Sequence, residues 1–241
     1  MSASSTPNEA PWLIPPALRL QLLALLASEP QNALTMTYEE FLDWADEDTR
    51  AEWVDGKVVM ASPVSVRPQL LVNFLVGVLN TYARLHDLGR VLNGPFQMKL
   101  ATSGRESDVL FVAKDHLDKL RPTFLDGPAD LAVEVISPES AGRARGDKFF
   151  EYQQGGVREC WLLDGERQRA EFYQLDAQGS YQIIVPAADG LYRSAVLPGL
   201  WLKVAWLWQE PLPSVDHVLL TIDRAAYESY LEQLRTQGEL P

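Results

Sequence analysis

The sequence predicts an α/β fold built on a mixed β-sheet. Hydrophobic patterns follow the order helix, hairpin, helix, several strands, helix and further strands, which is typical of helices packed on a sheet. The chain has 241 residues, of which 46% are hydrophobic and 10% aromatic. It can therefore bury a sizeable core and is not expected to be disordered, and its length allows one or two domains.

The N-terminal part is expected to lie outside this core. Dense apolar residues from 17 to 28 suit a helix, which Pro30 would end. We therefore predict an N-terminal extension with one helix over residues 1–34, a main domain over 35–208 and a C-terminal helical tail over 209–241.

The main domain should begin with a short helix and a β-hairpin. Thr37 and Glu40 have the spacing of a capping box, which starts a helix. Asp55-Gly56 then separates two alternating apolar segments, and this dipeptide is a strong hairpin signal. Residues 52–54 and 57–60 are therefore expected to pair.

A long helix and a series of strands should follow the hairpin. Apolar residues recur at helical spacing from Arg67 to Leu88, and Gly89 ends the pattern. Strand patterns then lie around Val91 and over residues 96–100, 107–112 and 131–136. A second helix is predicted over 143–154, three closing strands over 158–164, 170–175 and 181–185, and a tail helix over 218–234.

Composition limits the kinds of function that can be expected. The formal net charge is −12, which argues against a general nucleic-acid binder because such proteins are usually basic. No apolar run is long enough for a transmembrane helix and no signal peptide is recognisable, so a cytoplasmic location without membrane contact is expected. The single cysteine, Cys160, allows no internal disulfide and stands in an apolar run, which predicts an inert buried thiol.

Two acidic residues stand in strands that are otherwise apolar. Asp108 belongs to the strand over 107–112, and Glu134 to the Leu-Ala-Val-Glu-Val-Ile run over 131–136. An arginine could neutralise one buried acid, but two neighbouring acids repel each other strongly in a low dielectric. A divalent cation removes this conflict, and Mg²⁺ commonly takes one or two carboxylates together with water and substrate phosphate. The pair therefore favours a metal site over a purely structural pairing.

Basic residues cluster at the start of the second predicted helix. Cations in the first turns oppose the helix macrodipole, so helix stability does not explain Arg143, Arg145 and Lys148. The arginines could bind a substrate phosphate, or they could form a solvated face with Asp147 and Glu151. We interpret Lys148 as a residue that lines the pocket.

Several motifs between Leu34 and Trp208 resemble those of the Uma2 family of restriction-endonuclease-like proteins, and they follow one another in the family's order. The matching segments are Thr37–Phe41, Ala51–Gly56, Ser107–Val112, Asp130–Pro138, Arg145–Tyr152, Gly156–Asp164 and Leu197–Leu200. The resemblance implies the PD-(D/E)XK nuclease fold, which is a mixed central sheet flanked by helices. It also implies that the Asp of this motif corresponds to Asp108 and its Asp-or-Glu to Glu134.

The resemblance also gives Glu52 a role, because an early glutamate of the family corresponds to it. Without the resemblance, Glu52 would be interpreted as a solvated strand end. Two positions depart from the motif. Ser107 replaces the proline of the signature, and Ile136 stands where its lysine is expected. In this superfamily the following helix can supply the lysine, which makes Lys148 the candidate and Lys99 a weaker alternative.

Together these observations predict a Mg²⁺- or Mn²⁺-dependent endonuclease that hydrolyses phosphodiester bonds of nucleic acid, with DNA favoured. The expected metal ligands are Asp108, Glu134 and Glu52, the catalytic lysine is Lys148, and the phosphate contacts are Arg143 and Arg145. The fold also allows a homodimer. Two alternatives stay open: a nuclease-like scaffold without catalytic activity, favoured by the net charge and the displaced lysine, and a hydrolase of small phosphate esters.

Overall fold

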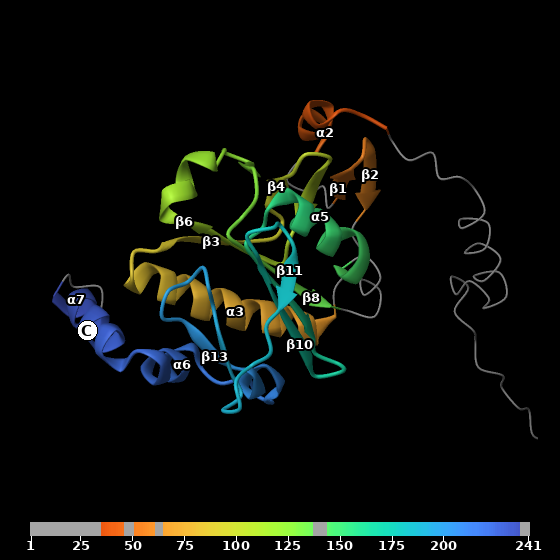
Figure 1. The fold of residues 1–241 in the computed structure, drawn as a ribbon. Helices are drawn as coiled ribbons and strands as arrows, with labels where there is room; N and C mark the ends of the chain where they lie inside the picture. The colour runs from red at the N-terminus through yellow and green to blue at the C-terminus, as the bar shows by residue number, and fades with distance from the viewer. Residues whose placement is uncertain (1–34, 46–50, 61–64, 137–143, 237–241) are drawn as a thin grey trace, which may run out of the picture.

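The computed structural model of the protein describes residues 35–45, 51–60, 65–136 and 144–236 (Figure 1). The predicted helix over 17–28 lies outside these residues. The described part contains a larger and a smaller β-sheet, with helices packed on them. The predicted α/β fold with a mixed sheet is therefore confirmed. Among the described helices, none is long and apolar enough to cross a membrane.

The larger sheet carries the apolar core on both of its faces. Its strands, in spatial order, are β11 (Tyr181–Ile183), β10 (Arg169–Leu175), β9 (Glu159–Asp164), β8 (Leu131–Ile136), β6 (Val109–Ala113) and β3 (Gly89–Asn93). β8 and β9 run parallel, whereas the other neighbours are antiparallel. Every residue of β8 and β9 is buried, as expected for central strands covered on both sides.

Helices cover the two faces of this sheet. α3 (Val66–Leu85) packs on the face that includes Val109 and Val133. The opposite face, which includes Leu110 and Ala132, contacts α5 (Phe149–Gly155), and a π-helical turn, η2 (Ala144–Lys148), leads into that helix. Cys160 is fully buried on the α5 face, which confirms the predicted core thiol.

The smaller sheet stands beside the α5 face (Figure 1). Its strands, in spatial order, are β2 (Lys57–Met60), β1 (Ala51–Val54), β5 (Ser103–Glu106), β4 (Gln97–Lys99) and β7 (Phe124–Asp126). The hairpin predicted at Asp55-Gly56 is confirmed, with positive φ at both residues. The capping box on α2 (Tyr38–Trp44) is also present, and this helix packs against the sheet through Tyr38 and Phe41.

The C-terminal part differs from the single helix predicted over 218–234. It forms α6 (Val215–Ile222) and α7 (Arg224–Thr236), because Asp223 between them has an extended φ of −148°. α6 buries Val218 and Leu219 in the same cluster as α3. The remaining elements are η1 (Lys114–Lys119), the hairpin of β12 (Leu191–Arg193) and β13 (Trp201–Lys203), and η3 (Val204–Trp208).

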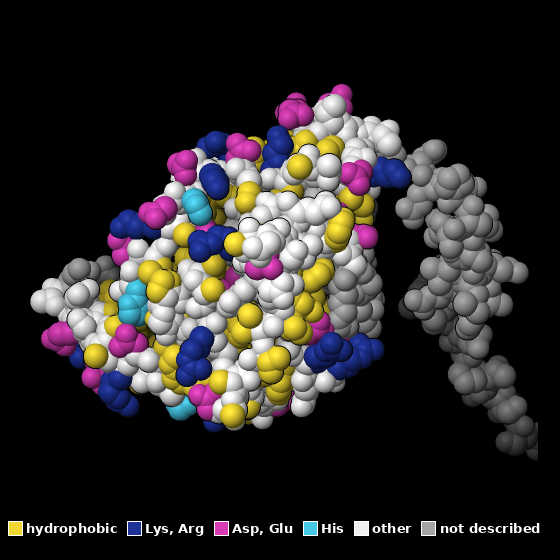
Figure 2. Space-filling view, viewed as in Figure 1, with side chains coloured by type: hydrophobic (Ala, Val, Ile, Leu, Met, Phe, Trp, Pro, Cys, Tyr) yellow, Lys and Arg dark blue, Asp and Glu magenta, His cyan; other side chains and the backbone are white. Residues whose placement is uncertain are grey.

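Two further differences concern the region of the predicted acids. The strand predicted over 107–112 begins only at Val109, so Asp108 lies in the link between β5 and β6. β5 itself was not predicted, because Ser-Gly-Arg-Glu has no apolar alternation. On the face shown in Figure 2, acidic and basic side chains are interspersed among the described residues.

Candidate functional site

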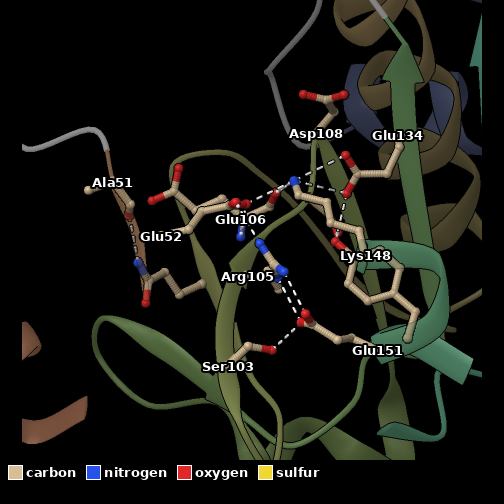
Figure 3. Close-up of polar contacts among 12 residues, drawn as sticks. Ala51, Glu52, Ser103, Arg105, Glu106, Asp108, Glu134, Lys148 and Glu151 are labelled. Carbon is tan, nitrogen blue, oxygen red and sulfur yellow. Dashed lines mark hydrogen bonds and ion pairs between the residues drawn. The ribbon is translucent and has the colours of Figure 1, made fainter. Parts of the chain in front are cut away.

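Four side chains that the sequence singled out come together where the smaller sheet meets the α5 face (Figure 3). Glu52 comes from β1, Asp108 from the link before β6, and Glu134 from β8, while Lys148 ends η2. The Nζ atom of Lys148 lies 2.8 Å from Oε1 of Glu52 and 3.2 Å from Oε2 of Glu134. Segments that are far apart in sequence therefore converge on one lysine.

The backbone brings the two central acids together. Glu134 points to the α5 face of the sheet because it alternates with Val133 and Val135, which face α3. Asp108 directly precedes Val109, which pairs with Val133, and its Oδ2 atom accepts a hydrogen bond of 2.7 Å from the amide of Val135. This bond places the carboxylate of Asp108 beside the residue that follows Glu134.

Burial dominates the electrostatics of both acids. Desolvation raises the pKa of Glu134 to about 7; the negative charge of Asp108 adds to this rise, whereas Lys148 opposes it. Desolvation also raises the pKa of Asp108, although the amide of Val135 counteracts it. Burial therefore disfavours negative charge on these two groups unless a further cation is present.

Lys148 is held by three acceptors. Besides its two ion pairs, its Nζ atom donates a hydrogen bond of 2.6 Å to the carbonyl oxygen of Glu106. Burial lowers the pKa of this amine, but the charges of Glu134 and Glu52 raise it more, so the net pKa lies above its ordinary value. Lys99, the weaker alternative, instead pairs with Glu39 at 3.5 Å.

Further residues of this site had not been assigned roles from the sequence. The hydroxyl of Tyr152 donates to Oε1 of Glu134 at 2.6 Å and lies 2.7 Å from Oγ of Ser107. Arg105 is buried and binds both Glu52 and Glu151. Helical spacing from Lys148 could have indicated Glu151 and Tyr152, whereas Arg105 lies in the strand that the sequence did not predict.

The two arginines predicted to contact phosphate are not tested by the described residues. Arg143 lies outside the described residues, and Arg145 is described only by its position in η2. Their role therefore stays a prediction.

The donor set fits a hard divalent cation. Among the described residues, no group of three or more His, Cys, Asp or Glu side chains is arranged to hold a metal ion. Asp108 and Glu134 nevertheless supply two carboxylates, the number that Mg²⁺ often takes from a protein. Glu52 is a weaker fit, since its oxygens already accept hydrogen bonds from Arg105 and the amide of Glu106 and pair with Lys148.

Comparisons with known proteins bear on the family and on the fold. The model of the Uma2 family, described as "Putative restriction endonuclease", matches residues 38–205. The structure is also similar to one described as a "putative nuclease belonging to DUF820" from Anabaena variabilis ATCC 29413. Its TM-score is 0.62 at 16% sequence identity, over 72% of this chain and 97% of that chain. This likeness shows the fold. No curated protein matches the chain.

Proposed function

The chain belongs to the Uma2 family, and on this premise we propose that it is a metal-dependent endonuclease that hydrolyses phosphodiester bonds of nucleic acid, with DNA as the favoured substrate. The observation that carries the proposal is the meeting of Asp108, Glu134 and Lys148 in one partly buried cluster. Two acids with raised pKa values beside a charged lysine suit a site that binds a cation and a phosphate.

In this proposal Asp108 and Glu134 hold Mg²⁺ or Mn²⁺. A bound divalent cation supplies positive charge that polarises a phosphate oxygen and makes a nearby water more acidic. Tyr152 fixes the orientation of Glu134 through the hydrogen bond of 2.6 Å to Oε1. The geometry thereby keeps one carboxylate in place before any ligand arrives.

Lys148 would act on the substrate itself. Its ammonium stays charged and is anchored by Glu52 and by the carbonyl of Glu106. Its three N–H donors contact Glu52, Glu134 and the Glu106 carbonyl. With a cation on Glu134, the donor at that acid could turn to a phosphate oxygen on which negative charge develops, or orient the attacking water. Glu52 is assigned to holding Lys148, and its role as an additional metal ligand remains part of the proposal.

The proposal is tested with supercoiled DNA, single-stranded DNA and RNA in the presence of Mg²⁺, Mn²⁺ or a chelator. We expect cleavage that requires a metal and falls by about 10²-fold or more in Glu134→Gln and Asp108→Asn, because each removes a group that organises charge at the reacting phosphate. Glu159→Gln is the matched control, since Glu159 is a buried acid outside the site. Equal activity of the wild type and Glu134→Gln would contradict the proposal.

A second candidate is a nuclease-like scaffold that binds a partner without catalysis. The net charge of −12 favours it, because it weakens attraction to a polyanion. Calorimetric titration separates the candidates: binding of Mn²⁺ or Mg²⁺ that is lost in Glu134→Gln supports the nuclease, and absence of binding supports the scaffold.

The predicted domain borders and a homodimer remain proposals. Limited proteolysis tests the domain borders, and light scattering tests the homodimer.

A further inference from the structure

A buried arginine joins the two sides of the site. Arg105 lies on β5 and only 2% of its surface is exposed. Its Nη1 atom contacts Oε2 of Glu52 at 3.2 Å, while Nε and Nη2 contact the two oxygens of Glu151 at 2.7 and 2.5 Å (Figure 3). The contact with Glu151 is a bidentate, fork-shaped ion pair, and this geometry restrains both partners.

Each partner of Arg105 bears on the position of Lys148. Glu52 uses its other oxygen, Oε1, for the ion pair of 2.8 Å with Lys148, so that arginine and lysine share one carboxylate. Glu151 follows Lys148 by three residues and lies one turn further along the same helical segment. The fork with Glu151 therefore restrains the segment that carries the lysine, and Ser103 adds a hydrogen bond of 2.5 Å to Glu151.

Stability alone is a weak reason for this arrangement. Burying an ion pair removes both partners from water, and well-packed apolar residues are often as stable as such a pair. Buried pairs are better known for fixing one arrangement among several. Here the arrangement that is fixed contains Lys148, the lysine that contacts Glu134.

We propose that Arg105 is a positioning residue, which holds Glu52 and Glu151 so that the ammonium of Lys148 stays beside Glu134. This inference deepens the proposed function, on which it rests for what Lys148 does to the substrate. Its geometric part can be tested without activity, because a restrained and a released lysine differ in chemical reactivity.

The test measures how fast the amine of Lys148 reacts in reductive methylation of the folded protein, read by peptide mass spectrometry. Lys203, which is exposed, is the internal reference. We expect Arg105→Gln to raise the rate at Lys148 relative to Lys203 by about tenfold or more, because a released lysine loses at least one of its own charge-assisted hydrogen bonds. Loss of the arginine charge alone would act in the opposite direction, since it leaves Glu52 to hold the ammonium more strongly. Arg105→Lys should show the same rise, because lysine keeps the charge but cannot form the fork.

Two further variants keep the test decisive. Glu151→Gln breaks the same fork from the helix side and should raise the rate at Lys148 even if Arg105→Gln fails to fold. Arg158→Gln is the matched control, because Arg158 pairs with buried Asp130 at 3.2 Å. Asp130 lies four residues before Glu134, about 13 Å along the strand. The rate at Lys148 should not change in this control.

The outcomes separate this proposal from the proposed function. An unchanged rate at Lys148 in folded Arg105→Gln or Glu151→Gln overturns the positioning role, and so does a return to the wild-type rate in Arg105→Lys. A raised rate together with loss of nucleic-acid cleavage supports both proposals. A raised rate in a protein whose wild type cleaves no nucleic acid supports the positioning role and rejects the nuclease.

Discussion

At the scale of single residues, two buried glutamates differ in the groups that surround them. Glu159 accepts hydrogen bonds from Trp161, Tyr192 and the segment 194–196, so its neighbours are arranged to hold a carboxylate. Glu134 instead faces Tyr152 and Lys148 beside another acid. The sequence placed Glu134 correctly in an apolar strand, but it could not reveal most of the donors to Glu159, because all of them except Trp161 come from residues 192–196, more than thirty residues away.

The first prediction at this scale concerns stability and pH. The pKa of Glu134 rises from 4.5 to about 7 on folding, so between these values the folded protein binds more protons than the unfolded chain. The free energy of unfolding therefore falls as the pH rises through this window. Glu134→Gln removes the effect and should be more stable than the wild type at pH 8, by up to about 3 kcal/mol, but not at pH 4.5.

Urea denaturation in the presence of a chelator measures this difference. Glu159→Gln provides the contrast, since its amide nitrogen cannot accept the bonds that Glu159 accepts, and it should lose about 1–3 kcal/mol at pH 4.5. Burial also raises the pKa of Glu159, so this loss should become smaller as the pH rises. If the advantage of Glu134→Gln does not grow between pH 4.5 and pH 8, the raised pKa of Glu134 is wrong.

At the scale of elements, long and strongly patterned segments could be predicted and short ones could not. α3 and β8 have local apolar patterns that leave little choice of structure. β5 has no such pattern and is a strand because β1 and β4 flank it on both sides. The residues on β5, including Arg105, were therefore inaccessible to sequence reasoning, and so was the packing of α6 on α3.

The prediction at this scale concerns α6. Leu219 is 1% exposed within the core cluster of α3, whereas Leu231 on α7 is only partly buried against it. Leu219→Ala should lower the free energy of unfolding by about 2–5 kcal/mol, the usual cost of emptying a closed core position. Leu231→Ala, the control, should cost clearly less. Equal small losses in urea denaturation would mean that α6 is an appendage and not part of the core.

At the scale of the whole molecule, the chain combines a nuclease fold with a net charge of −12. The family and the fold could be predicted from seven motifs that occur in a fixed order along the chain, and four of these motifs contain Glu52, Asp108, Glu134 and Lys148. Substrate preference could not be predicted in the same way. On the face shown in Figure 2, acidic and basic side chains are interspersed, so the surface charge there does not indicate a particular substrate. Encounter with a polyanion should therefore depend on bound cations.

The prediction at this scale concerns DNA binding. Fluorescence polarisation of a labelled duplex should show weak binding in KCl and binding about tenfold tighter when Ca²⁺ is added at matched ionic strength. Ca²⁺ takes oxygen ligands, so it can occupy a carboxylate pair. Glu134→Gln should lose this gain. An equal effect of Ca²⁺ on wild type and variant would show general screening only.

The single cysteine on the α5 face has a practical consequence for labelling. Cys160 is fully buried, and burial raises the pKa of its thiol well above the ordinary value, so little reactive thiolate is present. A cysteine introduced on the surface would therefore be the one thiol available to a maleimide dye or a photo-crosslinker, with Cys160 left in place. In the unlabelled protein, the rate at which Cys160 reacts with a thiol reagent would report how often the sheet opens.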